Sequence, residues 1–352
     1  MSQKKLTIMI LALVVALAAM PLFALAQAQQ APAGQQPPAG GGQGRGGGGG
    51  RGGDGRGGGA PGGAQGGRGG GAAQQAGQAI KQIKPGIFMV TGAGGNSTVR
   101  VSDEGVILVD TKNLGDQFYN DLLAQIKTVT PQPVKYAIVT HVHQDHSGNI
   151  ERFEKAGAQV VAYEGLNRNL HVGHTDGKGY TSNQGKPADA NAPYKGKNKK
   201  IKVGKAEAVA YHFDSGHTSG DTVVYFPDEK VVSLGDEFTA AGPNCDYPNG
   251  GSILGWSKSL AQVLKLDFDT AIPGHGNDPL KKDDVAAFQK RMDAIGKKAI
   301  ELVKNGTPKD QLKAQIQMQL GPEMGMWTMN GMVADGQRLD MFYDEISKAA
   351  KK

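Results

Sequence analysis

The order of apolar and polar positions along the chain predicts its secondary structure. From residue 83 onward, short runs that are apolar or that alternate between apolar and polar side chains are separated by glycine-rich turns, which is typical of strands. Other segments repeat apolar residues every three or four positions, as at Phe118, Leu122 and Ile126, which is typical of helices. We expect strands at 86–91, 97–101, 105–109, 134–139, 159–163, 206–213, 222–226, 230–234 and 270–272. We expect helices at 116–128, 149–156, 253–266, 283–304, 309–320 and 336–350. This order predicts an α/β domain with sheets inside and helices outside.

Residues 165–205 interrupt this pattern. They are polar and rich in glycine, and their second half is rich in lysine. The segment is interpreted as a solvated loop. A mobile flap beside a functional site is the alternative, because long loops in compact domains are often functional.

The first 78 residues have a different character. Residues 1–26 predict a signal peptide: Lys4 and Lys5 precede an apolar run, and Ala24-Leu25-Ala26 offers a cleavage site. Cleavage would place the protein in the periplasm or outside the cell, whereas a retained segment would be a membrane anchor. We expect no stable membrane insertion after cleavage. The catalytic domain is expected at residues 79–352.

Residues 27–78 are dominated by glycine, with spaced arginines. Such a segment has too little apolar surface to offset the entropy of ordering, so a disordered linker is predicted. An Arg/Gly-rich binding segment is the alternative. The formal charge of the chain is +6, of which the two signal-peptide lysines and the linker account for +5. The remaining domain is nearly neutral, so nucleic-acid binding by it is not expected.

The strongest chemical signal is a string of metal-binding side chains that directly follows the expected strand 134–139. It contains His141, His143, Asp145 and His146 within six positions. Zinc takes imidazole nitrogens and carboxylate oxygens at about 2.0–2.2 Å, so its ligands must be dense and convergent. His141 and His143 can point to one ion, and the following pair can turn to a second.

Three further candidates lie near the ends of expected strands: His217 in Gly-His-Thr, Asp236 in Gly-Asp, and His275 in Pro-Gly-His-Gly. Ends of strands are where α/β sheets place their sites. The other histidines, His171, His174 and His212, are interpreted as structural or exposed. Cys245 is the only cysteine, so an intramolecular disulfide is excluded, and its spacing does not indicate a metal ligand.

His-x-His-x-Asp-His followed by Gly-His-Thr, Gly-Asp and Pro-Gly-His-Gly resembles the metallo-β-lactamase superfamily. This resemblance extends over about residues 83–278 and includes Asp110, at the end of Val-Ile-Leu-Val-Asp. It implies an αββα four-layer sandwich that holds two zinc ions. By the resemblance, the first ion is held by His141, His143 and His217, the second by Asp145, His146 and His275, and Asp236 bridges both. The resemblance also makes Asp110 a buried residue behind the ligands, which it would orient through hydrogen bonds.

The resemblance implies a hydrolase that acts on a small-molecule substrate through a metal-bridging hydroxide, with Asp145 helping to orient the nucleophile. An ester, thioester, lactone, β-lactam or phosphodiester would be the substrate. Asp236 stands where β-lactamases of the family usually have Cys or Ser, which is closer to the thioesterase, lactonase and phosphodiesterase branches. Two alternatives stay open: an iron-dependent oxygenase on the same fold, and a non-enzymatic envelope protein that binds through its Gly/Arg-rich tract.

Overall fold

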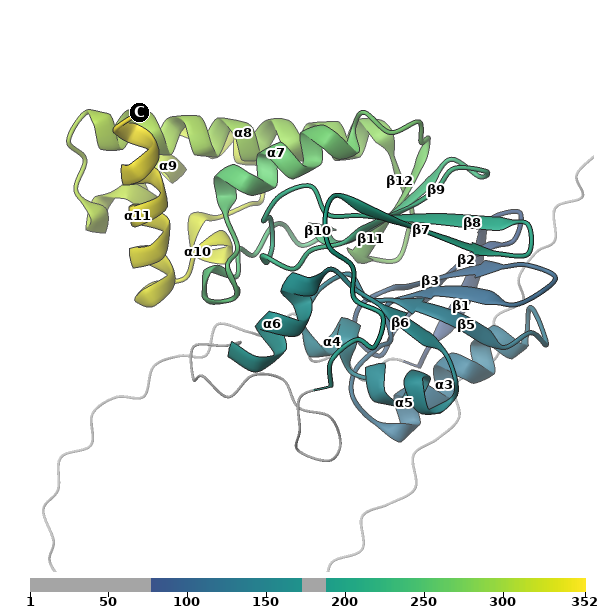
Figure 1. The fold of residues 1–352 in the computed structure, drawn as a ribbon. Helices are drawn as coiled ribbons and strands as arrows, with labels where there is room; N and C mark the ends of the chain where they lie inside the picture. Colours follow the sequence, from purple (N-terminus) through teal and green to yellow (C-terminus); the bar gives the residue numbers. More distant parts are fainter. Residues whose placement is uncertain (1–76, 173–187) are drawn as a thin grey trace, which may run out of the picture. The chain divides into compact units, whose positions relative to one another are not determined.

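The computed structural model describes residues 77–172 and 188–352, which belong to one compact unit, Ala64–Lys352 (Figure 1). The strands are β1 (Ala79–Lys84), β2 (Ile87–Thr91), β3 (Ser97–Val101), β4 (Val106–Val109), β5 (Val134–Ile138), β6 (Gln159–Val161), β7 (Asn198–Val203), β8 (Ala206–Tyr211), β9 (Val223–Phe226), β10 (Val231–Thr239), β11 (Thr270–His275) and β12 (Leu280–Lys281). The helices are α3 (Asp116–Lys127), α4 (Gln144–Ser147), α5 (Ile150–Lys155), α6 (Glu164–Val172), α7 (Ile253–Val263), α8 (Lys282–Lys304), α9 (Lys309–Met324), α10 (Met329–Met332) and α11 (Gln337–Ala350), with a 3₁₀ turn η2 at Tyr247–Asn249.

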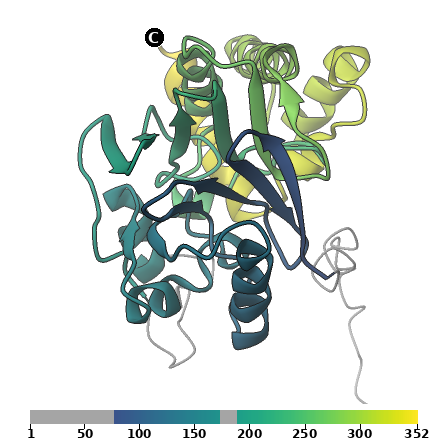
Figure 2. The ribbon, with the colours of Figure 1, turned by 90° about the vertical axis from the view of Figure 1, so that its right-hand side faces the viewer.

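The strands form two six-stranded sheets. One has the order β1-β2-β3-β4-β5-β6 and the other β12-β11-β10-β9-β8-β7. Apolar side chains of both sheets meet in one buried cluster, to which the first sheet contributes Ile107 and Ile138 and the second contributes Val224 and Ile272. The sheets are therefore packed face to face, and Figure 2 shows them between two sets of helices.

Each outer face of the sandwich is covered by helices. Leu122 of α3 and Phe153 of α5 pack on the first sheet, and Trp256 of α7 and Phe288 of α8 pack on the second. Each helix has an apolar face that is removed from water when it packs on a sheet. This burial accounts for the arrangement of helices outside and sheets inside. The expected αββα sandwich is confirmed.

The expected strands and helices are present with small shifts at their ends. Three longer elements were not expected: β1, and, in the segment expected to be a loop, α6 at residues 164–172 and β7 at residues 198–203. In β7 Ile201 and Val203 are buried and the lysines point mostly outward, so this is an edge strand protected by charge. Residues 1–76 and 173–187 lie outside the described residues, so the predicted signal peptide, nearly all of the linker and His174 remain sequence predictions.

Parallel pairing brings the carboxyl ends of several strands to one edge. β5 lies parallel to β4 and β6 in the first sheet, and β10 lies parallel to β11 in the second. The backbone N–H of Asn96, beyond β2, donates to the carbonyl of Gly274 on β11 at 2.7 Å, so loops of the two sheets meet at this edge. The edge carries the candidate site.

Candidate metal centre

The structure brings all seven predicted ligands together in two groups. The first contains His141, His143, His217 and Asp236, and the second contains Asp145, His146 and His275. They come from the segment between β5 and the end of α4, the loop after β8, and strands β10 and β11. Asp236 and His275 lie inside strands, because β10 and β11 run further than the sequence predicted.

In the first group, three ring nitrogens face one another. Nδ1 of His143 lies 3.1 Å from Nε2 of His141 and 2.8 Å from Nε2 of His217. Oδ2 of Asp236 lies 3.9 Å from Nε2 of His141 and 3.7 Å from Nε2 of His217. Ligand atoms that share one zinc ion at about 2.0–2.2 Å lie roughly 3–4 Å apart, so the spacing fits an ion between them.

The second group has similar spacing. Nε2 of His275 lies 3.1 Å from Oδ2 of Asp145 and 3.3 Å from Nε2 of His146. The other carboxylate oxygen of Asp236, Oδ1, lies 3.3 Å from Nε2 of His146 and 3.5 Å from Nε2 of His275. Asp236 therefore turns one oxygen toward each group, which is the arrangement of a bridging ligand.

The outer nitrogen of four of these imidazoles meets a hydrogen-bond acceptor, which determines the tautomer. Nδ1 of His217 donates to the carbonyl of Asn244 at 2.6 Å, and Nδ1 of His146 donates to Asp110 at 2.7 Å. The remaining two contacts are His141 Nδ1 with Thr140 Oγ1 at 3.0 Å and His143 Nε2 with Asp246 at 2.7 Å. In the neutral form of each ring, the inner nitrogen then carries no proton and offers a lone pair. Bare nitrogens about 3 Å apart repel unless a cation lies between them, so the donor set fits a metal.

Electrostatics favour the ligand forms in the first group. Burial, reinforced by His146, holds the pKa of His141 well below its usual value, and burial together with His143 lowers the pKa of His217 to about 4. Both imidazoles are thus neutral at pH 7. Burial opposes ionisation of Asp236, but His146 and His275 outweigh it and hold the pKa of this carboxyl well below its usual range. Neutral imidazoles and an ionised carboxylate are the forms that bind zinc.

The second group attracts positive charge. Burial disfavours the charged form of His146, but Asp145, Asp236 and Asp110 outweigh it and raise its pKa well above the usual value. Burial likewise acts to lower the pKa of His275, but Asp236 and the hydrogen bond with Asp145 outweigh burial and raise it. A metal cation would compete with protons for the same carboxylates, so binding here is expected to release protons.

Asp110 occupies the position that the resemblance implied. Its side chain is 1 % exposed and accepts hydrogen bonds from the backbone N–H of Thr140 at 2.8 Å, from the hydroxyl of Thr140 at 2.9 Å and from His146. Its φ of 63° lies in the left-handed region. This conformation is strained for a residue other than glycine, and such strain is found mainly at functional sites. Asp110 therefore orients His146.

Two glycines allow the backbone to approach the ligands closely. A Cβ atom on Gly95 would lie 2.2 Å from the ring of His146, and one on Gly274 would lie 2.0 Å from Oδ1 of Asp236. Neither position has room for a side chain. Both positions therefore need glycine for the backbone to pass this close to His146 and Asp236.

Sequence reasoning missed two residues beside the centre. Lys112 is fully buried with a φ of 68°, and its ammonium donates to the carbonyls of Val90 and Gly95, each at 2.7 Å. Asp246 accepts hydrogen bonds from His143 and from Asn249, each at 2.7 Å. Neither residue carries a local signal, because each acquires its role from partners far away in the sequence.

The structure also shows where the other histidines and the cysteine considered in the sequence lie. His171 lies on α6 and contacts Asp189 at 2.8 Å on the surface. His212 stacks on Tyr163 with 3.6 Å between ring centroids and contacts the carbonyl of Asp221. Both are outside the metal groups. Cys245 is fully buried in the apolar core.

Comparison with known proteins agrees with the resemblance that the sequence motifs indicated. The model of the metallo-beta-lactamase superfamily matches residues 90–275. A curated relative, 2,4-dinitroanisole O-demethylase subunit alpha of Nocardioides sp. (strain JS1661), is 25% identical over 177 residues, which are 49% of this chain. The chain spans about half the length of that relative, 50%.

Solved structures resemble the fold. The structure of DIM-1 metallo-beta-lactamase has a TM-score of 0.51 and 20% identity, covering 61% of this chain and 97% of the other. A metallo-beta-lactamase from Pontibacter korlensis has a TM-score of 0.50 and 19% identity, covering 61% and 99%. These likenesses concern the fold, and the last helices of the chain lie beyond the matched family segment.

Proposed function

The chain belongs to the metallo-beta-lactamase superfamily, and from this premise we propose that it is a metal-dependent hydrolase. We propose that it works with two zinc ions on a small ester, thioester, lactone, β-lactam or phosphodiester. The observation that carries this proposal is the convergence of bare imidazole nitrogens and carboxylate oxygens in two adjacent groups. Nitrogen and oxygen donors in groups of three or four suit zinc.

The proposed ligands follow the two groups. His141, His143 and His217 would hold the first ion, and Asp145, His146 and His275 would hold the second. Asp236 would offer one oxygen to each ion. When bound, the ions would lower the pKa of a shared water to about 7 and polarise the bond to be cleaved.

The exposure of the side chains indicates where substrate enters. His275 is 36% exposed and Asp145 24%, whereas His141 and His217 are 2% and 3% exposed. Substrate therefore approaches from the side of His275 and Asp145. Asp145 is the more exposed carboxylate of the centre, so its free edge is available to accept a proton from the attacking water and to orient it.

A second candidate rests on one comparison. The curated relative is named an O-demethylase, and removal of a methyl group from an aromatic ether proceeds either by substitution with water or by oxidation of the methyl carbon. The second route would require iron, oxygen and a two-electron reductant, and would release the methyl carbon as formaldehyde. A histidine and carboxylate donor set also binds iron. The metal that supports turnover separates the two candidates.

The activity test uses the full chain with residues 1–26 removed, loaded separately with zinc and with iron(II). Each form receives a chromogenic cephalosporin, a nitrophenyl phosphodiester, a thioester, a lactone and 2,4-dinitroanisole, with and without a chelator, while oxygen uptake is recorded. Chelator-sensitive turnover by the zinc form without oxygen uptake is the expected result. Turnover by the iron form alone, coupled to oxygen uptake, would replace the proposal with the oxygenase.

Export to the periplasm or beyond and a tethering role for residues 27–78 are parts of the same proposal. They rest on the sequence pattern at the start of the chain. Within the described residues, no helix has the length and apolarity needed to cross a membrane. Deletion of residues 27–78 is expected to leave turnover unchanged. Loss of all function on this deletion, in a folded protein with its metals, would favour the envelope-binding alternative.

A further inference from the structure

We propose that the C-terminal helix α11 is a working part of the metal centre, in which Arg338 and Glu345 are positioning residues that hold the 244–252 loop against His143 and His217. This inference rests on the proposed function, because it assumes that the first group binds a metal. It concerns residues beyond the segment that matches the family, 90–275.

The 244–252 loop touches two proposed ligands. The carbonyl of Asn244 accepts from Nδ1 of His217 at 2.6 Å, and the carboxylate of Asp246 accepts from Nε2 of His143 at 2.7 Å. The backbone N–H of Asp246 also donates to the carbonyl of His217 at 2.9 Å. The position of this loop therefore sets the orientation of two rings of the first group.

The loop fits closely against the chain that carries His217. A Cβ atom on Gly251 would lie 2.5 Å from the carbonyl of His217, and the N–H of Ser252 donates to the carbonyl of Gly216 at 2.9 Å. A shift of the loop would thus move the backbone of His217 as well as its ring. Among the described residues, no hydrogen bond or ion pair joins the loop to His275, which lies on β11.

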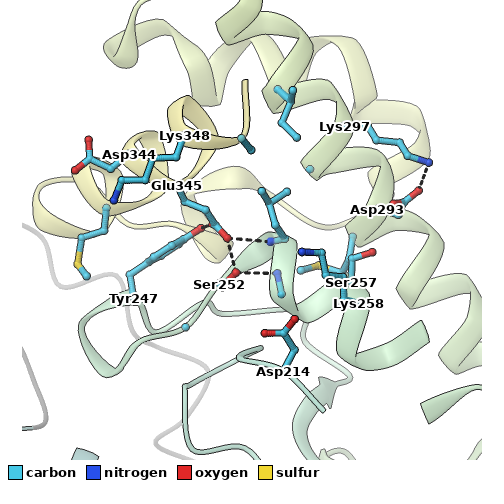
Figure 3. A pocket seen from close by; sticks show the side chains of 18 of the residues that line it. Asp214, Tyr247, Ser252, Ser257, Lys258, Asp293, Lys297, Asp344, Glu345 and Lys348 are labelled. Atoms are coloured by element: carbon cyan, nitrogen blue, oxygen red, sulfur yellow. Dashed lines mark hydrogen bonds and ion pairs between the residues drawn. The ribbon is translucent and has the colours of Figure 1, made fainter. Parts of the chain in front are cut away.

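Glu345 holds the far end of the loop (Figure 3). Its carboxylate accepts hydrogen bonds from the hydroxyls of Tyr247 and Ser252, and from the backbone N–H of Leu254 at 3.3 Å. Tyr247 begins the 3₁₀ turn of the loop, and Ser252 caps α7 by accepting from the N–H of Gly255 at 2.7 Å. One carboxylate on α11 therefore fixes three donors of the segment that follows Asp246.

Arg338 holds the near end. Its guanidinium donates to the side chain of Asn244 at 2.8 Å and lies 3.6 Å from Oδ1 of Asp246. That oxygen has no hydrogen-bond partner and the Asp246 side chain is only 1% exposed, so a nearby cation is needed to offset the cost of burying its charge. Arg338 supplies it at Oδ1, while the other oxygen of Asp246, Oδ2, accepts from His143.

The Glu345 contacts form one wall of a cavity of about 730 Å³ between α7, α8 and α11, which none of the proposed metal ligands lines. Figure 3 shows Glu345 pointing toward Ser252 and Tyr247 at this wall. The helix therefore acts on the centre through the loop.

The test compares metal binding at the two groups. Glu345→Gln replaces an acceptor by an amide whose NH₂ faces hydroxyl and N–H donors, and Arg338→Met removes the cation beside Asp246. Loss of a partner that orients a ligand typically weakens metal binding 10- to 100-fold. Cobalt(II) titrations followed by visible absorption, with zinc competition, are expected to show at least a tenfold weaker first group and an unchanged second group.

A matched control lies on the same helix. Asp340 forms an exposed ion pair with Lys309 on α9 at 2.6 Å. Among the described residues, it makes no hydrogen bond or ion pair with the 244–252 loop, so Asp340→Asn is expected to bind both metals normally. Tyr247→Phe removes one donor to Glu345 and keeps the ring, and it is expected to weaken the first group less than Glu345→Gln. This milder variant serves if Glu345→Gln does not fold.

The outcomes separate the inference from the proposed function. Wild-type protein that takes up no metal at the first group would refute the proposed function. Wild-type protein that binds two metals, with unchanged first-group affinity and cobalt spectrum in Arg338→Met and in folded Glu345→Gln or Tyr247→Phe, would overturn the role of α11 alone. Equal weakening of both groups would also overturn it, because it would indicate general destabilisation.

Discussion

Replacing the buried Lys112 by methionine should change how the stability of the protein depends on pH. Methionine has a similar length and keeps the apolar part of the side chain, but it cannot carry a charge. Burial lowers the pKa of Lys112 from 10.5 to about 7, against the opposing attraction of Asp110 and Asp145. In the unfolded chain the same amine is exposed and keeps the ordinary value.

The direction of the effect follows from proton binding. Between pH 7 and 10.5 the unfolded chain keeps the proton on Lys112 and the folded chain loses it, so unfolding takes up protons and the free energy of unfolding rises with pH. Each pH unit in this interval contributes up to about 1.4 kcal/mol. Between pH 7.5 and 9.5 the wild type should gain about 2.5 kcal/mol from this group.

The measurement is urea unfolding followed by circular dichroism at pH 7.5, 8.5 and 9.5, with chelator present because metal binding itself depends on pH. The free energy of unfolding of the wild type minus that of Lys112→Met should rise by about 2.5 kcal/mol across this range. Lys304→Met, at an exposed lysine that ends α8, should show the same pH dependence as the wild type.

Parallel curves for the wild type and Lys112→Met would refute this reasoning. They would mean that the amine keeps its ordinary pKa in the folded protein. A difference that falls as pH rises would contradict the sign of the effect. Either result would remove the basis for treating Lys112 as a desolvated amine that donates to Val90 and Gly95.

Two further predictions concern the metal centre. Gly95→Ala would place a Cβ atom 2.2 Å from the ring of His146, so it should weaken metal binding at the second group about tenfold or more. Gly321→Ala, where nothing lies within 4 Å, is the control, and equal metal content in both variants would contradict the expectation. Asp145→Asn should lose most hydrolytic activity while circular dichroism stays native, because the amide cannot accept a proton from water. Activity near the wild-type level would exclude the role proposed for Asp145.

Much of the fold could be predicted from the sequence because its cause is local. Strands such as β2 and β4 are marked by short apolar runs between turns, and helices such as α8 by their 3.6-residue repeat. The lysine-rich β7 and the short α6 were missed. An edge strand needs only one apolar face, and in β7 this face amounts to two residues among lysines, which is too weak a pattern for a sequence to reveal.

The residues of the candidate site also fall into two kinds: those that a local sequence pattern indicates, and those that only the folded chain brings together. The string from His141 to His146 is contiguous, so its ligand character can be read directly, and family resemblance extends the set to His217, Asp236 and His275. The residues behind the ligands carry no such mark. Asp246 contacts His143 across 103 positions, and Arg338 contacts Asn244 across 94.

The sequence by itself therefore determined most strands and helices and the string from His141 to His146, since periodicity and ligand spacing are properties of short segments. The resemblance of its motifs to the family implied the sandwich and the full set of seven residues that converge. Only the tertiary structure decided which nitrogen of each imidazole faces the centre, that Lys112 is buried and that α11 supports the loop beside His143. Hydrogen bonding and desolvation act between neighbours in space, and packing makes neighbours of residues that the chain keeps far apart.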